Sequence, residues 1–185
     1  MRTVGPGQSA LLLMDAVGVL EMEKIDYAVI GGMAASVHGV VRASLDADAI
    51  VSLPIQQAPA LERKFRGAGF RTILNRGDPD DPIPAVLGIG DSFQNRVDLL
   101  VGLRGLDSAA FARAVEVPFQ GASLRFIGRE DFVAMKVFAG GPQDVADAEA
   151  VIGAGRTALD TALLRRLAKQ FGRDAAELLE ELLAS

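Results

Sequence analysis

The chain has 185 residues, of which 50% are hydrophobic and 23% charged, and this composition excludes a disordered protein. Its 19 Lys and Arg residues against 24 Asp and Glu residues give a net charge of -5, which argues against a general nucleic-acid coat or a basic membrane-surface protein. Cysteine is absent and His38 is the single histidine, so the sequence excludes disulfides, Cys-based zinc sites and multi-histidine metal sites.

Hydrophobic periodicity predicts alternating helices and strands in the first part of the chain. Ser9 is a candidate N-cap of the first helix. In chain order we expect a helix at 8–22, a strand at 26–31, a short helix at 32–39, a strand at 45–53, a helix at 56–67, and strands at 69–74, 83–89, 95–101, 114–119 and 122–127.

From Gly128 onward the pattern is helical only, with Asp174 as a candidate N-cap of the last helix. The expected helices are 129–139, 143–153, 157–171 and 174–184. The chain therefore divides near residue 128. We predict an α/β (α+β) fold in which residues 1–128 form a core with a mixed β-sheet flanked by helices, and 129–185 form a helical region packed on it.

The apolar runs are far shorter than the ~20 residues that a membrane-spanning helix needs. The N-terminus has no apolar segment ahead of a cleavage site, so no signal peptide is visible. We therefore expect a cytoplasmic protein without a membrane partner.

Two acidic residues stand out at the start of the strand predicted at 45–53. Side chains alternate along a strand, so Asp46 and Asp48 point to the same face, where two ionised carboxylates repel each other. A cation between them relieves that repulsion, and hard carboxylate oxygens suit Mg2+, which completes its coordination with water and substrate phosphate. The alternative is that the two aspartates lie on an edge strand at the protein surface and bind no metal.

A third acidic residue, Asp98, is flanked by apolar residues in the strand predicted at 95–101. If that strand lies beside 45–53, Asp98 falls next to the pair. Three carboxylates on neighbouring strands can hold two metal ions that clamp the attacking and leaving oxygens of a phosphoryl transfer. Gly31 and Gly32, at the end of the preceding strand, would let the backbone approach the phosphates closely.

This order of features resembles the polymerase-β-like nucleotidyltransferase superfamily, and most closely the AbiEii-type toxin–antitoxin nucleotidyltransferases and their small bacterial relatives. A second block, residues 129–147, resembles the same branch, although Gly141 stands where relatives often have arginine. The matching positions of the first block are Gly31, Gly32, Arg42, Ser44, Asp46, Asp48 and Asp98.

The resemblance implies transfer of a nucleoside monophosphate from a nucleoside triphosphate (NTP) to a hydroxyl, with Mg2+ or Mn2+ as cofactor. It makes Asp46, Asp48 and Asp98 the metal ligands and catalytic residues, with Asp98 binding the acceptor-side metal or acting as base. The residues that it places on the nucleotide are Gly31, Gly32, Ser36, Arg42, Ser44 and Lys136. Asp144 and Asp147 would orient Lys136 or contact the base, and a solvated helix face is their alternative.

Other features leave alternatives open. His38 is expected to be a capping or packed residue, with contact to the triphosphate as the other possibility. The densest basic run is either a solvated face or a docking surface for RNA or a partner, and comprises Arg63, Lys64, Arg66, Arg71 and Arg76.

Two other functions compete with nucleotidyl transfer. A dinucleotide-binding fold fails because Gly31 and Gly32 are adjacent and no G-x-G-x-x-G follows, and no P-loop motif exists. A catalytically silent nucleotide- or partner-binding module of the same fold, such as a toxin–antitoxin component, remains open. The acceptor also remains open among RNA (including a tRNA end), a protein side chain and a small molecule such as an aminoglycoside, and a cognate antitoxin is a further candidate partner.

Overall fold

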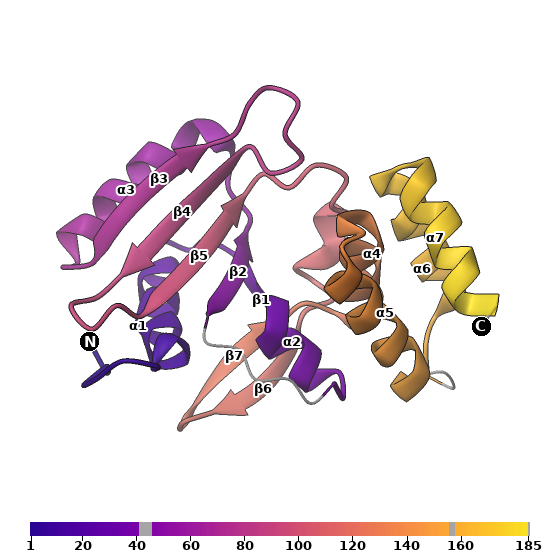
Figure 1. Ribbon diagram of the computed structural model, residues 1–185. Coiled ribbons are helices and arrows are strands. Elements are labelled where there is room, and N and C mark those ends of the chain that lie inside the picture. The colour runs from indigo at the N-terminus through magenta and orange to yellow at the C-terminus, as the bar shows by residue number, and fades with distance from the viewer. Residues whose placement is uncertain (41–45, 156–157, 185) are drawn as a thin grey trace.

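The computed structural model describes residues 1–40, 46–155 and 158–184 (Figure 1). Its strands are β1 (Tyr27–Ile30), β2 (Ala47–Val51), β3 (Arg71–Arg76), β4 (Ala85–Gly90), β5 (Arg96–Val101), β6 (Val115–Phe119) and β7 (Ala122–Phe126). They form one seven-stranded sheet in the order β3-β4-β5-β2-β1-β7-β6. The sheet is mixed, because β2 pairs parallel with β5 and antiparallel with β1. The predicted α/β fold with a mixed sheet is therefore confirmed.

The helices are α1 (Ser9–Met22), α2 (Gly31–Val37), α3 (Ala58–Gly67), α4 (Arg129–Ala139), α5 (Pro142–Gly155), α6 (Thr161–Phe171) and α7 (Arg173–Ala184), with short 3-10 turns at Ile55–Gln57 and Ser108–Ala110. Helix α1 packs on β5 and β2, and α3 packs on β3 and β4. Helices α4 to α7 gather at the other side of the molecule, as Figure 1 shows. Among the helices of the described part of the chain, none has the length and apolar character needed to cross a membrane.

The register of the sheet separates a buried row of side chains from an acidic one. Val29, Ala49, Leu99 and Leu87 are partners across β1, β2, β5 and β4, and each is fully buried. Because successive side chains of a strand point to opposite faces, the adjacent row, which contains Asp48, lies on the other face of the sheet. The hydrophobic core therefore fixes which face carries the acidic residues.

Both predicted helix caps are wrong. Helix α1 is preceded by Gln8, and the Ser9 hydroxyl instead accepts a hydrogen bond from the Arg96 backbone N–H at 3.2 Å. Asp174 lies inside the first turn of α7, which begins at Arg173. The side-chain cap is found at α6, where Asp160 accepts from the Leu163 N–H at 2.9 Å. That cap starts the helix four residues later than the periodicity predicts.

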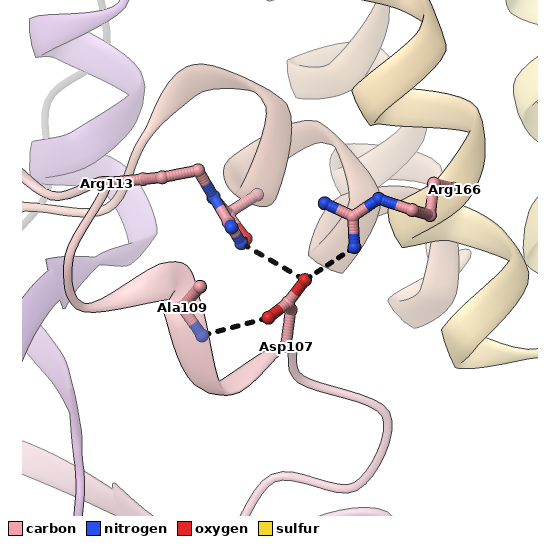
Figure 2. Close-up of polar contacts among 5 residues, drawn as sticks. Asp107, Ala109, Arg113 and Arg166 are labelled. Carbon is pink, nitrogen blue, oxygen red and sulfur yellow. Dashed lines mark hydrogen bonds and ion pairs between the residues drawn. The ribbon is translucent and has the colours of Figure 1, made fainter.

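A polar network joins the segment after β5 to α4 and α6 (Figure 2). Arg113 donates two hydrogen bonds of 2.7 Å to the carboxylate of Asp131, which is 2% exposed. Figure 2 shows Arg113 and Arg166 directed at the Asp107 carboxylate, with Arg166 Nη1 at 2.8 Å. The other oxygen of Asp107 accepts from the Ala109 N–H, also at 2.8 Å. These bonds link the last helices to the sheet region, while the division of the chain near residue 128 stays a prediction.

Candidate active site

Two of the predicted acidic residues lie opposite each other on neighbouring strands. Strand β5 lies beside β2, and their parallel register makes Asp48 and Asp98 direct partners. Partners in a ladder point to the same face, so both carboxylates leave the sheet on one side. Asp46 immediately precedes β2 and is exposed beside them. The structure thus brings the three acidic residues to one place.

A cleft of about 330 Å³ opens above these carboxylates. Its lining is mainly polar and combines sequence-predicted residues with one that was missed. The lining residues are Gly31, Gly32, Asp46, Asp48, Arg96, Asp98 and Lys136.

Burial and neighbouring negative charge together shift the pKa of Asp48. Burial first, and then the neighbouring carboxylates of Asp98 and Asp46, raise the pKa of Asp48 above its ordinary value, while Lys136 and Arg96 oppose the shift. The ionised form of Asp48 is therefore less stable in the folded chain than in water. A bound cation is the group that would relieve this energetic cost.

Arg96 is the cleft residue that the sequence analysis missed. Its Nε lies 2.8 Å from Oδ1 of Asp98, and the Asp98 side chain is 24% exposed against 59% for Arg96. The guanidinium supplies positive charge beside the carboxylates. The spacing could have identified it, because Arg96 precedes Asp98 by two positions and therefore lies on the same face of β5.

Lys136 reaches the cleft from α4 and is held there by two acidic residues of α5. Its Nζ lies 2.7 Å from Oδ1 of Asp144 and 2.9 Å from Oδ2 of Asp147. The side chains of Lys136 and Asp147 are only 13% and 2% exposed, which rules out a solvated helix face for either. Gln143 also donates to Asp147, at 3.1 Å. Asp144 and Asp147 were expected to orient Lys136 or to contact the base. The geometry fits orientation of Lys136.

Gly31 occupies a position that a side chain cannot share. Its φ is +64°, in the left-handed region, and a Cβ there would overlap the Asp48 carboxylate. The absence of a side chain therefore keeps the floor of the cleft open next to Asp48.

We expect Gly31→Ala to cost about 1–2 kcal/mol for the left-handed backbone and to displace the Asp48 carboxylate. A catalytic group displaced by about 1 Å costs roughly 100-fold in rate, so nucleotidyl transfer should fall by about that factor. The matched control is Gly153→Ala in α5, where the added methyl meets open space and should raise stability by up to ~1 kcal/mol. Urea unfolding and a transfer assay measure both; an active, unperturbed Gly31→Ala protein would contradict this view of the cleft.

Three further residues are predicted nucleotide contacts, namely Ser36, Arg42 and Ser44. Ser36 does not line the cleft, and its hydroxyl donates to the Gly32 carbonyl within α2 at 3.1 Å. Its contact with a triphosphate stays a prediction. Arg42 and Ser44 fall outside the described residues.

His38 is a packed capping residue, as expected. It is the C-cap residue of α2, is 6% exposed, and its Nε2 lies 2.8 Å from the Ile127 carbonyl oxygen. Its ring also lies against Phe132, with centroids 5.6 Å apart. Burial lowers the pKa of His38 below its usual range, although the hydrogen bond to Ile127 acts in the opposite direction.

The lowered pKa of His38 predicts a loss of stability in mild acid. As pH falls through the ordinary histidine value near 6.5, the unfolded chain takes up the proton first, so the free energy of unfolding decreases by at most about 1.4 kcal/mol per pH unit. Urea unfolding between pH 7.5 and 5.5 measures this, and the single imidazole can be titrated directly by NMR. His38→Gln should lose this part of the pH dependence; a histidine midpoint above 6.5 would contradict the assignment.

A second, apolar cleft of about 450 Å³ adjoins the acidic one and shares Gly31 and Lys136 with it. Side chains from the sheet, from the loop before β4 and from α4 form its walls. The larger apolar side chains are those of Ile30, Ile83, Leu100, Leu103, Phe132, Met135 and Phe138. A ligand with a charged part and a flat apolar part would find both environments side by side.

The acidic cleft suits a divalent cation in its donor chemistry. Three carboxylates offer hard oxygen ligands, and a cation would offset both the burial and the neighbouring negative charges that raise the pKa of Asp48. Within the described ranges, no three His, Cys, Asp or Glu side chains are already grouped as a metal site. Arg96 occupies one oxygen of Asp98 in this arrangement, so a metal bound there would take over that contact.

No family model matches this chain, and no curated protein sequence matches it. Solved structures do. The solution structure of the antibiotic-resistance factor ANT(2'')-Ia matches with a TM-score of 0.61 at 15% identity, over 96% of this chain and 97% of that chain. An antigenic nucleotidyltransferase-like protein from Paracoccidioides brasiliensis matches with a TM-score of 0.56 at 15% identity, over 96% and 92% of the two chains. The chain has the nucleotidyltransferase fold.

A crystal structure of ANT(2'')-Ia in complex with adenylyl-2''-tobramycin has the same fold, with a TM-score of 0.58 at 15% identity over 89% of this chain and 96% of that one. At this level of identity the likeness concerns the nucleotidyltransferase fold alone. What the chain does must therefore be argued from its own cleft.

Proposed function

We propose that this chain is a metal-dependent nucleotidyltransferase that moves a nucleoside monophosphate from an NTP to a hydroxyl acceptor. The observation that supports this most strongly is the pairing of Asp48 with Asp98 across two parallel strands, beside Asp46, in a cleft that Gly31 and Lys136 also line. Neighbouring carboxylates of this kind repel one another, and such groups with a perturbed pKa cluster at functional sites.

The NTP would lie across the two adjoining clefts. Gly31 and Gly32 leave room for the triphosphate at the floor, and Lys136, held by Asp144 and Asp147, offers its ammonium group to phosphate oxygens. The apolar cleft beside them would take the nucleobase and ribose. Mg2+ or Mn2+ bound by Asp46, Asp48 and Asp98 would stabilise the charge that develops on the phosphate oxygens.

In the proposed reaction, the acceptor hydroxyl oxygen forms a bond to the α-phosphorus of the NTP. The bond from that phosphorus to the bridging oxygen breaks, and pyrophosphate leaves. The hydroxyl proton passes to the Asp98 carboxylate, which lines the acidic cleft and is 24% exposed. Lys136 balances charge on the pyrophosphate as it departs.

The finer assignments are also proposals. The order of motifs around Gly31 and Asp48 supports a place near the AbiEii-type toxin–antitoxin nucleotidyltransferases, with Ser36, Arg42 and Ser44 as further nucleotide contacts. Such a protein would act in the cytoplasm on RNA or another macromolecule and would have a cognate antitoxin as partner. A helical region from residue 129 onward, packed on the core, would supply Lys136.

The test is incubation of the protein with each α-labelled NTP, with and without Mg2+, in the presence of total RNA, total protein or a small-molecule extract. We expect label to appear in one fraction only when the metal is present, and not with Asp98→Asn. NTP binding without transfer to any fraction would favour the catalytically silent binding module instead. Label in small molecules alone would contradict the toxin-like assignment.

A further inference from the structure

A third groove lies on the open face of the sheet, beyond the acidic cleft. Its volume is about 470 Å³, and β3, β4 and the turn between β4 and β5 form it. Helix α3 packs on β3 and β4 from the other face, since its Glu62 and Arg66 contact Thr72, whose side chain alternates with those in the groove. Among the residues that line the groove are Arg71, Ile73, Asn75, Gly88, Gly90 and Arg96.

The strand register connects this groove to the acidic cleft. One row across the sheet runs from Asp98 on β5 to Gly88 on β4 and Ile73 on β3. A Cβ on Gly88 would stand 3.4 Å from Oδ1 of Asp98 and 4.0 Å from Nη2 of Arg96, so the glycine leaves the floor free of a side chain up to the Asp98–Arg96 pair. Arg96 lines both spaces. A chain lying in the groove can therefore present its end to Asp98.

The next row of the sheet gives the groove its charge. It runs from Arg96 to Gly90 to Arg71, so two arginines flank a glycine, with backbones roughly 10 Å apart at two strand spacings. Asp91 is the acidic residue that also lines the groove, but it is 5% exposed and accepts hydrogen bonds from Asn95 and from the Phe93 N–H. Its carboxylate is thus turned away from a ligand.

The groove also offers apolar and amide contacts. Ile73 is 67% exposed, and Phe93, in the turn beside the groove, is 40% exposed. Asn75 adds a side-chain amide. Arginines for phosphates together with exposed aromatic side chains for base faces are the features by which open sheet faces bind single-stranded nucleic acid, and Phe93 is the aromatic side chain here. A polycationic amine would meet like charge at Arg71 and Arg96.

We propose that this groove binds the acceptor, and that the acceptor is a single-stranded polynucleotide whose terminal hydroxyl reaches Asp98. The inference rests on the proposed nucleotidyl transfer, in which the terminal hydroxyl of the polynucleotide is the acceptor and pyrophosphate leaves. A footprint with two arginines is compatible with the net charge of -5, because it requires local contacts rather than a basic surface. It also separates Arg71 from the rest of the basic run, whose Lys64 and Arg66 pair with Glu23 and Glu62.

The experiment measures two affinities for each of three proteins. Fluorescence anisotropy gives binding of a labelled 12-nucleotide single-stranded RNA of mixed sequence over a series of salt concentrations, and calorimetry gives binding of Mg2+–NTP. The proteins are the wild type, Arg71→Glu in the groove, and Arg63→Glu on the exposed surface of α3, which has the same change in charge. Because Arg71 lines neither of the two clefts assigned to the NTP, NTP binding should be equal in all three.

We expect the wild type and Arg63→Glu to bind the RNA alike, and Arg71→Glu to bind it roughly tenfold more weakly. The slope of log affinity against log salt should become shallower by about 0.7 when the Arg71 contact is lost. Equal RNA binding by both variants, or no RNA binding by a protein that binds NTP, would overturn the groove assignment. Absence of NTP binding by the wild type would count against the proposed function. The comparison of RNA binding by the three proteins tests the groove independently.

Discussion

Asp48→Asn is expected to abolish nucleotidyl transfer and, at the same time, to make the metal-free protein more stable. The amide removes a negative charge that burial and the carboxylates of Asp98 and Asp46 disfavour. It also removes a proposed metal ligand, and loss of several kcal/mol of transition-state stabilisation lowers the rate roughly 1000-fold or more. A substitution that raises stability while destroying activity identifies a residue kept for function.

The pH dependence of this gain follows from the direction of the shift. Because the folded chain raises the pKa of Asp48, the ionised group costs stability at neutral pH, and that cost disappears as the group becomes protonated in acid. The increase in Tm of Asp48→Asn should therefore be largest near pH 7.5 and should shrink toward the ordinary aspartate value near 4. Asp80→Asn, in the exposed loop before β4, has the same charge change and should alter neither Tm nor activity. A less stable Asp48→Asn protein at pH 7.5 would contradict the assignment.

Arg113→Ala is expected to cause the largest loss of stability, about 3 kcal/mol, by leaving the Asp131 carboxylate buried without its two hydrogen bonds of 2.7 Å. For a chain of this size, that loss corresponds to a decrease in Tm of roughly 6–12 °C. The effect extends beyond one pair, because Arg113 also faces Asp107, which holds Arg166 of α6 (Figure 2). Urea unfolding followed by circular dichroism measures the loss.

The control for burial is Arg173→Ala on α7. Arg173 also pairs with a carboxylate at 2.7 Å, but it is 86% exposed and its partner Glu177 is 59% exposed. An exposed pair contributes at most about 1 kcal/mol, so this variant should unfold almost as the wild type does. The double variant Arg113→Ala with Asp131→Leu should recover part of the lost stability, because it removes the uncompensated charge. Equal losses for Arg113→Ala and Arg173→Ala would show that the Asp131 network does not support the fold.

Much of the fold could be predicted from the sequence because its elements have clear periodicity. Alternation and turn residues placed β4, β5, β6 and β7 to within two residues, and helical spacing placed α4 correctly at 129–139. Helix caps could not be predicted, because a capping side chain competes with tertiary partners. Ser9 bonds to Arg96, a residue 87 positions away, and sequence spacing carries no information about that contact.

The candidate site was predictable where residues share a strand or a glycine turn. Alternation predicts Asp46 and Asp48 on one face; both line the acidic cleft, although Asp46 lies just before β2. The apolar neighbours of Asp98 marked it as a strand residue, but its proximity to the pair depended on the two strands being neighbours, as they are in the structure. The two ion pairs of Lys136 with Asp144 and Asp147 were harder to predict, because they depend on how α5 packs against α4. The groove lined by Arg71 and Arg96 could not be predicted for a similar reason, because it depends on the order of β3, β4 and β5 in the sheet.

The measurement that tests the central claim most directly is calorimetric titration of the wild type with each NTP, with Mg2+ and with EDTA in its place. We expect binding of at least one NTP that is strong with Mg2+ and greatly weakened without it or in Asp48→Asn. The absence of metal-dependent binding for every NTP would contradict the assignment of Asp46, Asp48 and Asp98 to a nucleotidyltransferase site.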